Sequence, residues 1–134
     1  MEVKIDTKER FYVVSIETAC FTATMAEELS QKLTPYLKMD VNSSGTPGNI
    51  VLKMTAVTTL DPEGAQALLQ LQQLFYEHNR SFVICEMSQS VDAFLEKEEL
   101  LELMNATPTE SEAWDIVQME EIERELLDNE FSDN

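Results

Sequence analysis

Residues 49–64 read NIVLKMTAVTTLDPEG, and this stretch decides the fold of the 134-residue chain. Its apolar run, residues 50–52, predicts a buried strand, which a short threonine-rich loop joins to a helix. Asp61 is a good N-cap, Pro62 suits the first helical position, and Glu63 complements the positive end of the helix dipole. Such a helix start is a natural anion site. It lacks, however, the glycines and lysine of a phosphate-binding loop and the serine of a nucleophile elbow.

The residues after this stretch predict a parallel βαβ unit. The helix that begins after Asp61 carries apolar residues at helical spacing and is expected to end near Asn79. Residues 81–85, SFVIC, form a second nearly continuous apolar run, which is typical of a strand buried on both faces. Two such strands joined by a helix of this length pair in parallel, with a right-handed crossover.

The residues before this stretch predict a hairpin and a helix. Residues 3–5 and 11–16 are strand-like runs separated by a charged turn. Apolar residues at a spacing of four over residues 25–37 predict an amphipathic helix, with Thr24 as its cap and a proline that should distort it or end it early. Residues 39–48, MDVNSSGTPG, have the composition of a loop.

The last third of the chain predicts mostly helix. Residues 88–104 are expected to be largely helical, and the sequence leaves open a short strand around Ala106. Thr109 begins a capping box at the head of a final helix over residues 110–127. The acidic tail, residues 128–134, is expected to be disordered. This length and pattern predict a single domain over residues 1–127.

The formal charge of −17 is concentrated in the C-terminal part of the chain. From Glu86 onward there are 16 acidic and 2 basic residues, a net charge of −14, which leaves −3 for the first 85 residues. Such a surface repels nucleic acid and anionic lipid and favours basic partner surfaces, although a merely solvating face would look the same. The sequence shows no signal segment and no long apolar run, so we expect a cytoplasmic protein without membrane insertion.

Catalytic and metal-binding patterns are weak. Cys20 and Cys85 lie in apolar surroundings without a CxxC motif and are expected to be buried, reduced thiols. His78 stands at a helix end, where an exposed C-terminal cap is the better interpretation than a catalytic base. No set of side chains suits zinc or calcium, and no cofactor is expected. We therefore predict no enzymatic activity.

The final helix carries more apolar residues than one buried face needs. Ala113, Ile116 and Val117 could lie on the sheet, and Trp114 is expected to be partly buried. An apolar stripe then continues among glutamates. Its members are Met119, Ile122, Leu126 and Leu127. This stripe could seal the fold, which we favour, pack against another copy as a homodimer, or dock into a groove on a partner.

The order of elements, and an apolar strand leading into L-D-x-x-G, resemble the STAS domain family of bacterial anti-sigma factor antagonists. The resemblance covers roughly residues 3–126, and residues 50–69 carry most of it. It implies a single STAS-like (SpoIIAA-like) α/β domain, with a mixed central sheet of about four to five strands and about four helices packed mainly on one face. It also implies a bacterial protein with a role in transcription regulation and signalling.

In that family, the residue directly after the motif's aspartate is the serine or threonine that a partner kinase phosphorylates. Here Asp61 and Gly64 match the motif, but Pro62 occupies the acceptor position, so the usual switch is degenerate. The protein could be a permanently unmodified antagonist, or Glu63 could imitate the phosphorylated state. The Glu63 carboxylate lies one position after the acceptor and carries about one negative charge, whereas a phosphate carries −1.5 to −2. This difference favours a permanently unmodified antagonist. A stable helix start with no further role is the third interpretation.

The resemblance implies regulatory protein binding without catalysis. The partner would be a kinase-type anti-sigma factor or a related regulator, bound through a small surface. That surface comprises Thr58, Thr59, Asp61, Pro62, Glu63 and Gly64. Thr58 or Thr59 would be the candidate for any modification. The alternatives are a STAS scaffold subunit of a stress-signalling complex or of a lipid-transport ABC system, and a small-molecule sensing domain.

Overall fold

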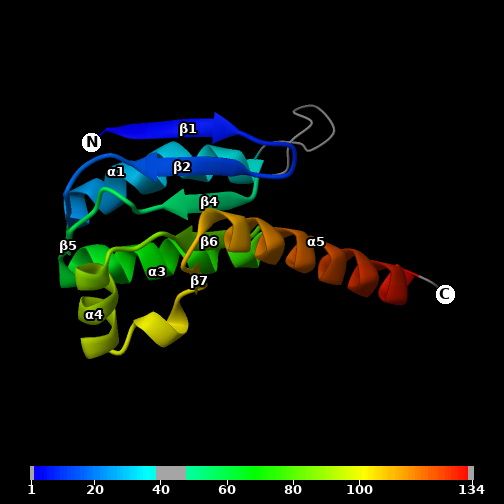
Figure 1. Cartoon of the computed structure of the whole chain (residues 1–134). Coiled ribbons are helices and arrows are strands. Elements are labelled where there is room, and N and C mark those ends of the chain that lie inside the picture. The colour runs from blue at the N-terminus through cyan, green and yellow to red at the C-terminus, as the bar shows by residue number, and fades with distance from the viewer. Residues whose placement is uncertain (1, 39–47, 133–134) are drawn as a thin grey trace.

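A computed structural model describes residues 2–38 and 48–132, with side chains through Leu127 (Figure 1). Most of the loop predicted at residues 39–48 lies outside the described residues. The described strands and helices follow in this order: β1 (Val3–Thr7), β2 (Tyr12–Ile16), β3 (Cys20–Phe21), α1 (Ala23–Leu33), the 3-10 helix η1 (Thr34–Lys38), β4 (Ile50–Lys53), β5 (Thr59–Leu60), α3 (Pro62–Glu77), β6 (Phe82–Cys85), α4 (Gln89–Lys97), the 3-10 helix η2 (Leu101–Leu103), β7 (Ala106–Thr107) and α5 (Glu110–Ser132).

The main sheet has five strands in the order β1-β2-β4-β6-β7. β1 pairs antiparallel with β2, which confirms the predicted hairpin. β2, β4, β6 and β7 are parallel, and β4 and β6 flank α3 in the sequence, which confirms the predicted βαβ unit. β1 forms one edge, and two of its five side chains, Lys4 and Asp6, are charged, which suits an edge strand that must not pair with another chain.

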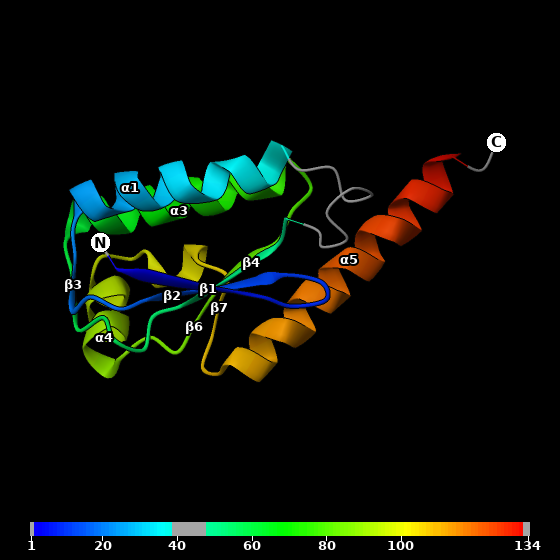
Figure 2. The same cartoon turned by 90° about the horizontal axis from the view of Figure 1, so that it is seen from above.

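Both faces of the sheet are covered, because successive side chains of a strand point to opposite faces. On one face, residues of β2, β4 and β6 pack under α1, α3 and α4. On the other face, the alternate residues of the same strands pack under α5. Figure 2 shows the sheet between the α1–α3 layer and α5. The mixed sheet with helices mainly on one face matches the predicted STAS-like architecture.

Helix α1 begins earlier than the sequence suggests. The prediction that Thr24 caps it is wrong, since the N-cap is Thr22, whose side chain accepts a hydrogen bond from the backbone N–H of Met25. The extended backbone of Thr22 continues from β3, so the chain turns into the helix two residues sooner. The helix ends at Leu33 and continues as the short 3-10 helix η1, as expected from the proline in that segment.

Two short strands, β3 and β5, were not predicted from the sequence. They pair in parallel, with Cys20 opposite Thr59 and Phe21 opposite Leu60. Phe21 is buried, whereas Cys20 is exposed. The predicted burial of Cys20 is therefore wrong, because strand alternation turns its side chain away from the core that Phe21 enters. The prediction for Cys85 is confirmed: it is a fully buried free thiol in β6.

Helix α5 begins as predicted and ends later. The hydroxyl of Thr109 accepts a hydrogen bond from the N–H of Glu112 at 3.2 Å. Ala113 and Val117 are buried against the sheet, and Trp114 is 38% exposed. The helix continues to Ser132, since residues 128–132 contain neither glycine nor proline.

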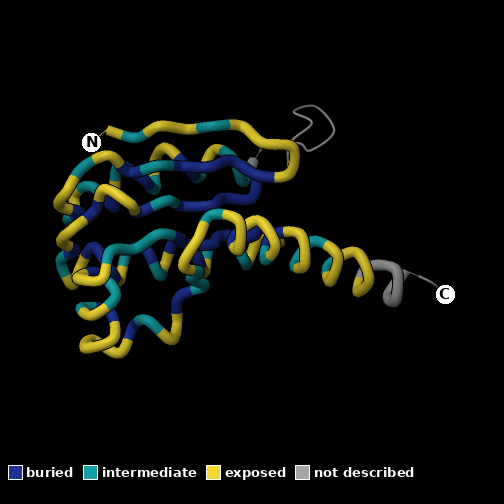
Figure 3. The backbone as a smooth tube through the Cα atoms, in the orientation of Figure 1, coloured by how far each residue is buried: buried dark blue, intermediate teal, exposed yellow. Residues whose placement is uncertain are grey.

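The apolar stripe on α5 does not seal the fold. Its four members remain 52–62% exposed, and the second half of the helix extends beyond the sheet (Figure 3). The favoured interpretation of the stripe is therefore wrong: even Met119 is 59% exposed, although Val117 and Glu120 on either side of it contact the body.

Candidate functional site

The Asp61 carboxylate joins the starts of two helices. Its Oδ1 atom accepts a hydrogen bond from the N–H of Gly64 at 2.6 Å, which caps α3 as predicted. Its Oδ2 atom accepts from the N–H of Ala23, in the first turn of α1, at 3.3 Å. The anion site expected at this helix start is therefore filled from within, because the side chain of Asp61 accepts from both helices.

Gly64 is required by the close approach of α3 to the connection between β3 and α1. A Cβ atom on Gly64 would lie 3.2 Å from the Asp61 Oδ1 atom, from the Phe21 carbonyl oxygen and from the Thr22 carbonyl carbon. Any side chain at this position would crowd the cap and the backbone of the preceding segment. The glycine of the motif thus serves the packing of the helix start.

Thr58 and Thr59 are exposed, and hydrogen bonds fix their backbone. Both of their N–H groups donate to the carbonyl of Ala19, at 2.8 and 3.1 Å. The hydroxyl of Thr58 donates to the same carbonyl at 3.3 Å, and that of Thr59 lies 2.7 Å from the Cys20 sulfur. The loop before α3 is therefore held rigidly, with both threonine side chains accessible from solvent.

The structure adds neighbours that the sequence analysis missed. Ser90, in the first turn of α4, donates to the carbonyl of Thr58 at 2.8 Å and lies 3.1 Å from the Ser88 hydroxyl. Cys20 comes from β3. These residues are far from the motif in sequence, and only the pairing of β3 with β5 and the packing of α4 bring them to it. The serine pair at the start of α4 is the signal that the sequence offered, since Ser88 is the N-cap of that helix and Ser90 lies in its first turn.

The predicted site residues form one continuous surface at the start of α3, which we call the Asp61 surface. It consists of Thr58, Thr59, Asp61, Pro62, Glu63 and Gly64. Pro62 and Glu63 are exposed in the first turn of α3, Asp61 is half-buried and Gly64 is buried. Glu63 is its exposed carboxylate. Hydrogen bonds fix the backbone of this surface and Glu63 gives it a negative charge, and both features suit contact with another macromolecule.

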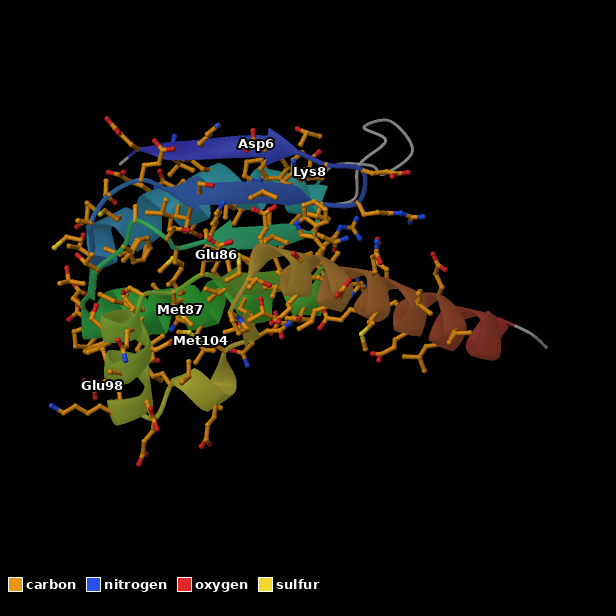
Figure 4. All side chains as sticks on the ribbon, in the orientation of Figure 1. Asp6, Lys8, Glu86, Met87, Glu98 and Met104 are labelled. Atoms are coloured by element: carbon orange, nitrogen blue, oxygen red, sulfur yellow. The ribbon has the colours of Figure 1, made fainter. Side chains whose placement is uncertain are left out.

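Two hollows elsewhere on the protein are candidate ligand sites. One, of about 350 Å³, lies between α4 and β7 and is lined by Met87 and Met104 (Figure 4). The other, also of about 350 Å³, lies at the carboxyl ends of the strands and is lined by Lys53 and Glu86. In it, the Lys53 ammonium lies 3.3 Å from a Glu110 carboxylate oxygen, and hydrogen bonding to Glu110 raises the pKa of Lys53. Lys53 is therefore already paired within the protein.

Catalytic groups are scarce in the part of the chain that the structure describes. His78 is exposed at the C-cap of α3, and its Nδ1 atom lies 2.9 Å from the Leu74 carbonyl oxygen, which confirms the predicted capping role. Within residues 2–38 and 48–132 there is no cluster of three or more histidine, cysteine or acidic side chains arranged to hold a metal ion. Within the same residues, no helix has the length and apolar character to cross a membrane.

Comparison with known proteins identifies a family. The model of the STAS domain matches residues 2–113, which extend from β1 into the first turn of α5. No curated protein matches this chain in sequence. The family match includes the whole Asp61 surface but leaves out the greater part of α5.

Solved structures share the fold. An anti-sigma-factor antagonist (STAS) domain protein from Planctomyces limnophilus matches with a TM-score of 0.69 and 13% identity, over 87% of this chain and 97% of that one. The anti-sigma factor antagonist SpoIIAA, in its unphosphorylated form, matches with a TM-score of 0.64 and 16% identity, over 87% and 96% of the two chains.

A much larger protein contains a similar unit. The murine Solute Carrier 26 family member A9 anion transporter matches with a TM-score of 0.66 and 17% identity. The match covers 85% of this chain but only 18% of the transporter chain. At these identities the likeness shows the fold alone, which therefore occurs both in single-domain regulators and as a part of a transporter.

Proposed function

This chain belongs to the STAS domain family, and from that premise we propose that it is a non-catalytic antagonist that binds a kinase-type anti-sigma factor, or a related regulator, through the Asp61 surface. In this role it would release a sigma factor and so regulate transcription in a bacterial cytoplasm. The single observation that carries the proposal is the rigid, solvent-facing start of α3. There, Pro62 and Glu63 are exposed and the Asp61 carboxylate fixes the backbone beneath them.

Pro62 determines how the proposed regulator is controlled. Proline has no hydroxyl, so a kinase cannot modify the position that follows Asp61. Glu63 is exposed on the first turn of α3 and carries one charge, whereas a phosphoserine carries about −1.5 to −2. We therefore propose that the protein remains competent to bind its partner whether or not the kinase is active.

The experiment uses the purified full chain and the individually purified anti-sigma factor kinases of its host. Binding is measured by titration calorimetry for the wild type, Glu63→Lys and Pro62→Ser. We expect one kinase to bind the wild type and Glu63→Lys to weaken that binding at least tenfold, which is about 1.4 kcal/mol. Glu77→Lys is the matched control, because it makes the same charge change at the other, exposed end of α3 and should not alter affinity.

Pro62→Ser tests the lost switch. With ATP, we expect the bound kinase to phosphorylate Pro62→Ser and to release it, while the wild type stays unmodified and bound. Mass spectrometry then locates the phosphate. Phosphate on Thr58 or Thr59 of the wild type would contradict the claim of permanent binding. If none of the host's kinases binds the wild type, the antagonist function is excluded.

A scaffold role is the second candidate, because the same fold occurs as part of a large transporter chain. In that case the protein would be a STAS subunit of a stress-signalling complex or of a lipid-transport ABC system, with a homodimer through α5 as one mode of assembly. Co-purification of such subunits with a tagged chain, with binding insensitive to Glu63→Lys, would favour it. A small-molecule sensing role would rest on the hollow beside Met87 and Met104. A ligand whose binding Met104→Gln abolishes would support that role.

A further inference from the structure

Helix α5 leaves the body of the protein halfway along its length. Its first half is anchored on the sheet by Ala113 and Val117 and by a hydrogen bond from the Tyr76 hydroxyl to Glu120. Arg124 then donates to the Ser81 hydroxyl at 3.2 Å. The helix continues to Ser132 and projects past the edge of the sheet (Figure 1). The side chains described beyond Arg124, those of Glu125, Leu126 and Leu127, are all exposed.

An apolar stripe runs along the side of α5 opposite the side that packs on the sheet, although Ile122 at its margin also lines a hollow with Arg10 of the body. Three of the four exposed apolar residues named above form this stripe, which we call the α5 stripe: Met119, Ile122 and Leu126, which are 59%, 55% and 62% exposed. The spacing of three and then four residues places these side chains on one face of a helix. At 100° per residue, that face lies opposite the face that carries Val117 and Arg124. The stripe is thus not the margin of the buried core but a second, separate apolar surface.

The charges on both sides of the α5 stripe have the same sign. Glu123 lies on one flank and Glu125 on the other, and both are exposed. Over residues 110–132 there are nine acidic residues and one basic residue. The basic residue, Arg124, points to the body, where it contacts Ser81. The helix therefore combines a heptad-like apolar seam with an acidic residue on each flank, and the Glu125 flank shares a hollow with Arg10 of the body.

This charge pattern determines which kind of helix can pair with the α5 stripe. In paired helices, residues that flank the apolar seam of one helix face the flanking residues of the other, and like charges there are unfavourable. A second copy of this chain would place glutamates against glutamates. A helix with an apolar seam and lysine or arginine on its flanks would instead neutralise Glu123 and Glu125. The free stripe and its charge thus fit a basic partner and disfavour self-association.

We propose that the α5 stripe is a docking surface for a basic amphipathic helix of a partner protein, which pairs with α5 along Met119, Ile122 and Leu126. This surface lies on a different element from the Asp61 surface, on the helix that the STAS family match largely leaves out. The chain therefore has two separate places for macromolecular contact, and each can be altered without the other.

The test uses two synthetic 21-residue peptides and the purified full chain. Both peptides carry leucine at heptad positions a and d; one has lysine at positions e and g, and the other has glutamate there. Binding is measured by titration calorimetry, and helix formation by circular dichroism. We expect the lysine peptide to bind the wild type and to gain helicity, and the glutamate peptide to bind at least tenfold more weakly.

The matched variants distinguish binding of the lysine peptide to the α5 stripe from general electrostatic attraction to the acidic protein. The combined variant Met119→Gln, Ile122→Gln and Leu126→Gln keeps the charge and the helix-forming tendency, and we expect it to bind the lysine peptide at least tenfold more weakly. Leu103→Gln removes an equally exposed apolar side chain, 58% exposed in η2, and should bind like the wild type. Equal melting temperatures of the three proteins would show that the fold is intact.

Two outcomes would overturn the proposal. If the combined variant binds the lysine peptide as tightly as the wild type does, the attraction is only electrostatic and the stripe is not a docking surface. If sedimentation of the wild type at 0.15 M salt shows a dimer that the combined variant does not form, the occupant is a second copy. We expect a monomer for both proteins.

Discussion

The carboxylate of Asp61 accepts backbone N–H groups from the first turns of both α1 and α3. One side chain therefore fixes the relative position of two helices as well as capping one of them. Beside it, Gly64 allows α3 to approach the β3–α1 connection, and exposed Glu63 presents its charge to solvent. At the level of the residue, the Asp-x-x-Gly pattern thus fixes the backbone at the start of α3, and a partner-binding role would depend on that fixed backbone.

Substitution of Asp61 tests how much its cap stabilises the start of α3. We expect Asp61→Ala to lower the free energy of unfolding by about 1–2 kcal/mol, because it removes an N-cap. Asp61→Asn should cost less, since asparagine is also a good N-cap and keeps the bond to Gly64. Urea denaturation monitored by circular dichroism measures both values. An equal loss in the two variants would show that the charge of Asp61, and not its capping oxygen, stabilises the helix start.

The two cysteines should differ sharply in reactivity. Burial, reinforced by nearby Glu86 and Glu110, raises the pKa of the Cys85 thiol to about 12, so that at pH 8 only about one molecule in 10⁴ carries its thiolate. Cys20 is exposed. In the native protein we expect iodoacetamide to give a single adduct, on Cys20, and Cys20→Ser to give none, as measured by mass spectrometry. An adduct on Cys85 in the native state would contradict its burial. Unfolding in urea should expose both.

At the level of elements, a hydrogen-bond network joins α3 to α5 across the end of β7. The Tyr76 hydroxyl on α3 donates to the Glu120 carboxylate on α5 at 2.6 Å. Asn105, just before β7, donates to both Tyr76 and Glu120, and its own N–H donates to Gln72 of α3. Burial and hydrogen bonding to Glu120 raise the pKa of Tyr76, which keeps its hydroxyl protonated and donating. This network positions the half of α5 that precedes the projecting segment.

Tyr76→Phe should break the network with little loss of packing. We expect a decrease of about 1.5–3 kcal/mol in the free energy of unfolding, because a hydrogen bond to a charged group is lost and Glu120 keeps only its bond to Asn105. Tyr36→Phe is the control, since the ring of Tyr36 packs on Tyr12 with a centroid distance of 4.4 Å and needs no hydroxyl to do so. Chemical denaturation measures both. A loss of equal size in Tyr36→Phe would show that removing any tyrosine hydroxyl is equally costly, and that the bond to Glu120 has no special weight.

At the level of the whole molecule, a compact sheet-and-helix body carries a projecting acidic helix. The body buries two apolar clusters, one on each face of the sheet. The charge is distributed unequally, since residues 86–134 hold −14 of the −17. A long-range field of one sign around the projecting part would speed association with basic partners and weaken with added salt. Most of the negative charge thus lies in the segment that supplies α4, β7 and α5.

Hydrogen exchange should distinguish the part of α5 that packs on the body from the part that projects beyond it. We expect the amides of α5 up to Arg124 to be protected nearly as well as those of α3, and the amides after it to exchange much faster, because the next side chains, Glu125, Leu126 and Leu127, are exposed. Arg124→Gln should move the boundary toward the start of the helix by removing the contact with Ser81. Mass-spectrometric exchange measures this profile. Uniform protection along the wild-type helix would show that α5 is covered in solution by another molecule.

Much of the fold is present in the sequence because its signals are local. The apolar runs at residues 50–52 and 81–85, and the cap formed by Asp61 and Pro62, each specify one element through short-range rules. Two buried strands flanking one helix then leave little choice of topology. The residues of the Asp61 surface could be predicted for the same reason, since they are consecutive in the chain.

The tertiary structure alone decided the remainder. Thr22 rather than Thr24 caps α1, because β3 brings the chain to its turn sooner, and two-residue strands such as β3 are too short to show any periodicity. Cys20 is exposed because its strand neighbour Phe21 takes the core side. The α5 stripe faces solvent because it lies on the side of the helix opposite the side that packs on the sheet. The sequence by itself determined which segments are apolar and where α3 and α5 begin; which apolar side chains are covered depends on distances between elements, and only packing in three dimensions sets those.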